Sequence, residues 1–173
     1  MILYNLDRLI KFTLISTVMC VSFTAVAHAQ DSVEALGAEL VEKIKSGDRE
    51  GLAALVDPES AAYLMENDPG RLDSMLDVWA ELEIPDEYQL TVRKPAEIEN
   101  YNPSTQTFDM GHIAMFFPIV PDSFIELSTE TEARVEIDGE EGVARGMAIF
   151  LFDAARKYGD RWYLVIPVIK EKR

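Results

Sequence analysis

Cysteine and histidine are nearly absent from this chain, which has one cysteine and two histidines. Cys20 and His28 both lie in an N-terminal segment that we expect to be removed, so His112 would be the only imidazole of the remaining protein. A chain without cysteine forms no disulfide and supports neither thiol catalysis nor a thiolate metal site. One imidazole is too few for a multi-histidine zinc site, so we expect no metal.

Basic residues are scarce as well. Lys and Arg number 16 against 31 Asp and Glu, which gives a formal net charge of −15. Nucleic acids and anionic membrane surfaces would repel such a chain, and we expect neither as a partner. The sequence has no glycine-rich phosphate loop, no Gly-x-Ser-x-Gly, no His-Glu-x-x-His and no Asp-x-Asp-x-Asp-Gly. It therefore predicts no cofactor and no calcium site, and a solvated acidic surface instead.

The first 29 residues have the pattern of a secretory signal peptide. Arg8 and Lys11 precede an apolar run over 12–27, and the run ends in Ala27-His28-Ala29. Small residues at these two alanine positions suit a signal peptidase. We expect cleavage after Ala29 and export to the periplasm or beyond, which leaves one domain over 30–173 without a membrane span. A retained N-terminal anchor is the alternative, although the run is short for a full span.

Hydrophobic periodicity predicts helices in the first half of the domain. Apolar residues recur at helical spacing after a capping pattern at 31–34, and Gly47 is a natural stop, so we expect a helix over 32–46. Asp48 can cap a second helix that ends at Asp57-Pro58. A short helical turn over 61–65 and a third amphipathic helix over 72–82 follow.

After Pro85 the period of the apolar residues changes to two, which predicts strands. The expected strands cover 88–93, 108–117, 124–127, 131–137, 143–155 and 161–169, with a hairpin turn at Asp138-Gly139. Helices followed by an antiparallel meander predict an α+β domain. Its N-terminal helices would pack on one face of a curved antiparallel sheet.

Two stretches resemble the nuclear transport factor 2-like, or SnoaL-like, superfamily. The stretch 44–56, Ile-Lys-Ser-Gly-Asp-Arg-Glu-Gly-Leu-Ala-Ala-Leu-Val, is similar to the Gly-Asp-x-x-x-Leu-x-x-Leu step between the family's first two helices. The stretch 158–164, Tyr-Gly-Asp-Arg-Trp-Tyr-Leu, is similar to the Gly-x-Trp start of its closing strand. The resemblance implies a cone-shaped, cystatin-like roll around a cavity. Family members use that cavity as an isomerase or dehydratase site, as a ligand pocket or only as packing, often in dimers.

His112 and Asp153 are the candidate catalytic residues. Alternation places His112 on one face of the predicted strand 108–117, where it could act as a general base if that face lined a cavity. A carboxylate such as Asp153 would be its partner. The alternative is a structural histidine satisfied by one hydrogen bond. Simple alternation puts Asp153 on the same face of its strand as Arg145, Met147, Ile149 and Leu151.

An apolar ligand pocket is the second candidate site. Tyr63, Trp79 and Trp162 could form an aromatic wall for an apolar ligand. His112 and Met147 could complete the lining, because methionine adapts to irregular apolar shapes. The helical spacing of Trp79 also fits a plain core residue.

These patterns favour an exported, non-enzymatic domain that binds a small apolar ligand or a protein partner of the cell envelope. We expect a homodimer through the outer face of the sheet, where Phe150 and Phe152 would otherwise be exposed. One alternative is a cofactor-independent isomerase, dehydratase or hydrolase that uses His112 with a carboxylate. Another is a structural accessory subunit with its interior filled by Trp79, Phe116 and Met147.

Overall fold

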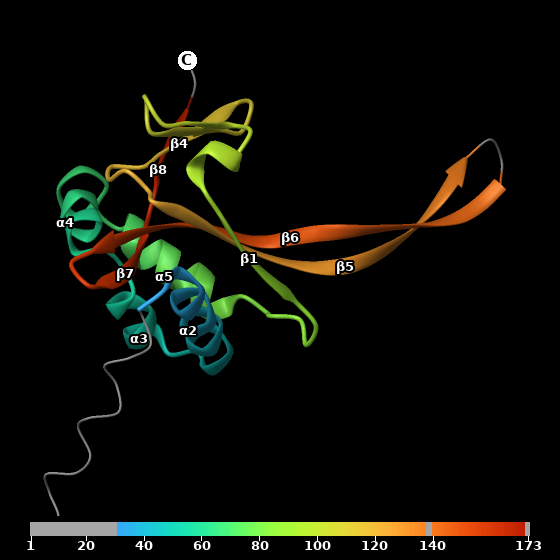
Figure 1. Ribbon diagram of the computed structural model, residues 1–173, viewed down its shortest axis with the longest axis horizontal. Coiled ribbons are helices and arrows are strands. Elements are labelled where there is room, and N and C mark those ends of the chain that lie inside the picture. The colour runs from blue at the N-terminus through green and yellow to red at the C-terminus, as the bar shows by residue number, and fades with distance from the viewer. Residues whose placement is uncertain (1–30, 138–139, 172–173) are drawn as a thin grey trace, which may run out of the picture.

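Helices and strands occupy separate halves of the chain in the computed structural model, which describes residues 31–137 and 140–171 (Figure 1). The helices of this part are α2 (Val33–Ser46), α3 (Arg49–Ala54), α4 (Pro58–Asn67) and α5 (Arg71–Glu81). The signal peptide expected over 1–29 and the turn expected at Asp138-Gly139 lie outside the described residues. The α+β class predicted from the sequence is confirmed.

Local capping explains where the first two helices begin and end. The Ser32 hydroxyl accepts a hydrogen bond from the Ala35 N–H at 3.1 Å, and α2 ends at Gly47, whose φ of 64° favours glycine. The Asp48 carboxylate then accepts from the Gly51 N–H at 2.8 Å and begins α3. The helix predicted over 32–46 and the Asp48 cap are therefore confirmed.

The helical turn predicted over 61–65 is part of a longer helix, α4, so the prediction is right in kind but too short. The Asp57 carboxylate accepts from the Ser60 N–H at 2.8 Å, and Pro58 occupies the first turn, where its missing N–H costs nothing. Asp57-Pro58 thus begins a helix rather than only ending one. The helix predicted over 72–82 corresponds to α5.

The strands of the described residues form two antiparallel sheets. The main sheet has the order β1-β5-β6-β7, with bounds Gln89–Arg93, Ser123–Ile137, Glu140–Tyr158 and Arg161–Val165. The small sheet has the order β2-β3-β4-β8, with bounds Tyr101–Asn102, Thr107–Asp109, Ile113–Phe116 and Val168–Glu171. A 3₁₀ helix, η1 (Pro95–Glu97), lies between β1 and β2.

Three strand predictions need correction. The single strand expected over 108–117 is a hairpin, because Gly111 has a φ of 85° and its N–H bonds to the Asp109 side chain at 2.8 Å, which turns the chain between β3 and β4. The strands expected over 124–127 and 131–137 are one strand, β5. The strand expected over 161–169 breaks before Pro167, and its end joins the small sheet as β8.

The main sheet separates two hydrophobic cores. On one face, Ile125, Leu127 and Leu164 pack against the helices. On the other face, Phe124 and Val165 pack against the small sheet. Figure 1 shows α2 and α3 below β6 in the view, α4 at the left beside the strands, and the small sheet at the top. The strands are thus divided between two sheets, and the second sheet covers the face expected to be free.

The outer part of the β5–β6 hairpin projects beyond both layers (Figure 1). On one side, β1 pairs with β5 only as far as Ser128. On the other side, β7 pairs with β6 only from Ala154 onward. We call residues 129–137 and 140–149 the arm. Within the described part of the chain, the arm is a two-stranded ribbon without a third strand.

None of the helices in residues 31–137 and 140–171 combines the length and the apolar character needed to span a bilayer.

Candidate functional site

An apolar groove lies between the main sheet and the small sheet. Its volume is about 590 Å³, within the range of small-ligand sites. β1, β5 and β6 form one wall, and the segment from η1 to β4 forms the other. The residues around it are Arg93, Glu97, Ile98, Glu99, Asn100, Phe108, Met110, Met115, Glu126, Ile149 and Phe152.

Stacked aromatic rings hold the two walls of the groove together. The Phe152 ring stacks on the Phe124 ring, with centroids 5.1 Å apart and 15° between their planes. The Phe108 ring of the small sheet lies 5.4 Å from the Phe152 ring. Phe124 is fully buried, so the stacking contact with its ring holds the Phe152 ring in position. The lining is therefore set by packing rather than by loop conformation.

One ion pair belongs to the lining of the groove, which also includes the polar residues Glu97, Glu99 and Asn100. The Arg93 Nε donates to the Glu126 carboxylate at 2.9 Å. The Glu126 side chain is 11% exposed, whereas the Arg93 side chain is 43% exposed. Because Arg93 neutralises Glu126, the remaining charges at the groove are those of Glu97 and Glu99. This balance favours a neutral or cationic ligand over an anionic one.

The structure places His112 in the turn between β3 and β4, where it is exposed. The prediction of a strand through His112 is wrong, because the chain turns at Gly111. His112 does not line the groove, although its neighbour Met110 does.

Asp153 is buried on the opposite face of the main sheet, toward the helices. It is 5% exposed and pairs with Ile125 of the helix-side core. Burial raises the pKa of Asp153 to about 7, and a hydrogen bond from Trp79 lowers it in part. Its Oδ2 has no hydrogen-bond partner. His112 and Asp153 thus belong to different layers of the fold, and they do not form a dyad.

Alternation along the long strand also needs correction. Leu151 pairs with Leu127, but Ile149 pairs with Ser128, so Phe150 is an extra residue on β6. A β-bulge of this kind changes which residues share a face. Leu151 and Asp153 face the helices, whereas Arg145, Met147 and Ile149 face the other way. The prediction that all five share one face is wrong.

The candidate ligand residues do not gather around one pocket. Trp79 and Trp162 belong to the core between helices and main sheet, with Trp79 only 2% exposed. The Tyr63 ring of α4 lies 6.4 Å from the Phe116 ring of β4. Met147 is on the arm and 47% exposed. Of the residues expected at a free sheet face, Phe150 packs against the helix-side core and Phe152 lines the groove.

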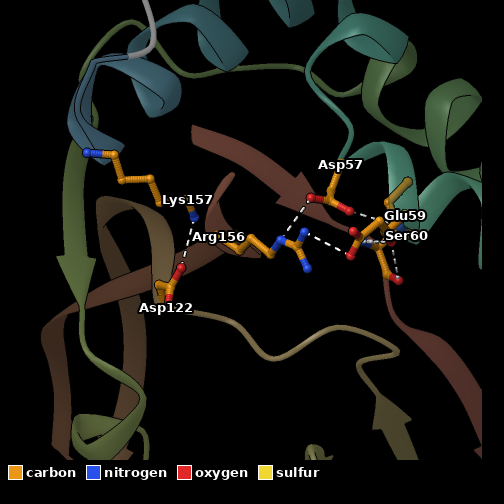
Figure 2. Close-up of polar contacts among 7 residues, drawn as sticks. Asp57, Glu59, Ser60, Asp122, Arg156 and Lys157 are labelled. Atoms are coloured by element: carbon orange, nitrogen blue, oxygen red, sulfur yellow. Dashed lines mark hydrogen bonds and ion pairs between the residues drawn. The ribbon is translucent and has the colours of Figure 1, made fainter. Parts of the chain in front are cut away.

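A second polar cluster joins α4 to the sheets (Figure 2). The Arg156 Nε lies 3.0 Å from the fully buried Asp57 carboxylate, and its Nη2 lies 2.9 Å from the Glu59 carboxylate. The Ser60 hydroxyl accepts from the Ile166 N–H at 3.2 Å. One guanidinium bridges two carboxylates, and the buried carboxylate also caps α4, so this cluster explains the position of the helix without a ligand.

Sequence reasoning missed the groove residues. Glu126 gives the one signal, because it is an acidic residue inside the apolar run 124–127. Nothing in the sequence around Ile98 or Met110 marks them as neighbours of Phe152. Their proximity follows from the way the two sheets are stacked.

Comparison of the chain with family models, with curated proteins and with solved structures found no match in any of the three. Among the residues that the structure describes, no three His, Cys, Asp or Glu side chains are grouped as metal ligands would be.

Proposed function

We propose that this protein is an exported, non-enzymatic binding protein that takes a small apolar ligand in the groove between its two sheets. The observation that carries the proposal is the groove itself, about 590 Å³ in volume and lined by Ile98, Phe108, Met115, Ile149 and Phe152. A shaped apolar groove with a single internal ion pair is typical of a ligand site.

Side chains left partly in water give the ligand its free energy of binding. Met110 is 48% exposed and Ile149 is 56% exposed. Full burial of such a side chain is worth about 1.5–3 kcal/mol, so covering the remaining half of each gives roughly 1 kcal/mol per residue. Contacts with the aromatic rings add to this, which favours a neutral or cationic apolar molecule as the ligand.

Export remains part of the proposal on the strength of the pattern over 1–29. The resemblance to nuclear transport factor 2-like proteins also remains a proposal, supported by the order of helices and antiparallel strands. The isomerase alternative loses its main support, because His112 and Asp153 lie in different layers.

The binding test is a titration with a neutral apolar fluorescent probe, preceded by native mass spectrometry of the protein recovered from the envelope. The variant Met110→Glu puts a charge into the groove and should weaken probe binding about tenfold or more. Met65→Glu is the matched control, because Met65 is 66% exposed on α4 and outside the groove. Equal affinities for both variants, or no binding by the unmodified protein, would refute the proposal. The intact mass also reports whether residues 1–29 are removed.

A further inference from the structure

The arm has an unpaired backbone edge. β6 pairs with β7 only from Ala154 onward, so its outer edge from Glu140 to Asp153 has no ladder partner among the described residues. A two-stranded ribbon is marginally stable in water, and a long free edge attracts another strand.

One face of the same strand carries exposed apolar side chains. Val143 is 61%, Met147 is 47% and Ile149 is 56% exposed. They share a face because they are separated by even numbers of residues in the regular stretch of β6 that precedes the bulge at Phe150. Arg145, between them, pairs with the Glu132 carboxylate at 2.8 Å. The free edge and the apolar face thus coincide on one segment.

The two edges of the arm differ in charge. On β6 the acidic residues Glu140 and Glu141 are the first two of the strand, and the stretch from Val143 to Phe152 has one charged residue, Arg145. Beyond the end of β1, acidic residues are spread along β5, namely Glu130, Glu132 and Glu136, with one basic residue, Arg134. Acidic side chains discourage strand addition at an edge, above all by another acidic chain. The edge of β6 is therefore the one open to a strand from a protein with this composition.

We propose that two copies of this chain pair β6 to β6 in antiparallel fashion, around a two-fold axis at Gly146. In this register Val143 opposes the partner's Ile149, and Arg145 opposes the partner's Met147. The apolar stripes of the two copies then form one continuous stripe across a joined sheet. A two-fold interface uses the same surface on both copies, and a strand that pairs with its own copy meets this requirement.

The area of this interface sets its strength. The register pairs residues 140–152 of each copy, which span about 44 Å at about 3.4 Å per residue. With a sheet thickness of about 10 Å, the interface covers roughly 440 Å² per copy and about 900 Å² in total. This is at the low end for specific interfaces, so a concentration-dependent dimer results. Salt should strengthen it, because both copies carry a net charge of −15 that salt screens.

The test is sedimentation equilibrium of the protein purified from cells that express the full chain. We expect a monomer–dimer equilibrium that shifts toward dimer between low and high salt. Met147→Lys should weaken dimerisation about tenfold or more, because this register places each new ammonium directly opposite the cationic Arg145 of the other copy. Met65→Lys on α4 is the matched control and should leave dimerisation unchanged. A monomer at all concentrations, or equal effects of both variants, overturns the inference and favours a strand from a different protein.

Hydrogen exchange of the unmodified protein is the second measurement and does not depend on a variant. The amides of β6 over 143–149 that point to the free edge should exchange more slowly in concentrated than in dilute solution. Exchange that is independent of concentration overturns the inference. Met147 does not line the groove and Met110 is not on the arm, so the two proposals fail separately.

Discussion

Replacement of Asp153 tests the account of the helix-side core most directly. The residue is 5% exposed, its carboxyl accepts a hydrogen bond from Trp79, and its Oδ2 has no partner. Ionising a carboxyl in such a place costs free energy, and burial accordingly raises the pKa of Asp153 to about 7. Asp153→Asn preserves the shape and the acceptor for Trp79, and it removes the charge.

The sign and size of the effect follow from proton linkage. The pKa of an aspartate in the unfolded chain is about 3.9, so the folded protein, with a pKa of about 7 for Asp153, binds the proton more tightly. The free energy of unfolding therefore falls as the pH rises from about 4 to about 7, and this contribution is constant outside that window. A difference of about three pKa units corresponds to about 4 kcal/mol. Asp153→Asn does not titrate, so its stability relative to the unmodified protein should rise by about that amount.

Urea denaturation followed by circular dichroism, at pH values from 4 to 8, measures this difference. At pH 4 the two proteins should have similar free energies of unfolding, and at pH 8 the variant should be more stable. Asp86→Asn, at an exposed position, is the matched control and should differ from the unmodified protein by less than about 0.5 kcal/mol at every pH. A difference between Asp153→Asn and the unmodified protein that does not change with pH would refute the reasoning.

Two further substitutions test buried polar groups. Arg156→Met leaves the Asp57 carboxylate buried without its cation, and we expect a loss of about 3–5 kcal/mol in the free energy of unfolding by urea denaturation. Arg145→Met is its control, because the Arg145–Glu132 pair is exposed and should contribute less than about 1 kcal/mol; equal losses would contradict the argument. Tyr101→Phe removes a buried hydroxyl without a hydrogen-bond partner, so the melting temperature should stay the same or rise, and a clear fall would show an unrecognised partner.

The helices were predictable because their signals are local. Ser32, Gly47 and Asp48 each act on residues within a few positions along the chain, and the structure bears out all three. Asp57-Pro58 was misread for a different reason. The same dipeptide can end one helix or begin the next. Here the Asp57 carboxylate caps α4 and also pairs with Arg156, which comes from a strand about a hundred residues later.

The groove was not predictable because its walls belong to different sheets. Phe108 and Phe152 come together only when β3 joins one sheet and β6 the other. That division depends on the break before Pro167, after which the chain leaves β7 and pairs with β4. Hydrophobic alternation shows that a strand has two faces, but it does not show what covers each face.

A single extra residue connects the groove with the arm. Without the bulge at Phe150, regular alternation would turn Ile149 and Met147 toward the helix side of the sheet, together with Leu151. The helices do not extend along the arm (Figure 1), so Met147 would be exposed on that side as well, but its apolar stripe would no longer continue from the groove. With the bulge, Ile149 lines the groove and also begins the apolar stripe that continues to Val143. Ligand binding in the groove and pairing of the arms therefore share one residue, Ile149. If both proposals hold, Ile149→Glu should weaken the two processes together, whereas Met110→Glu should weaken only ligand binding and Met147→Lys only the pairing of the arms.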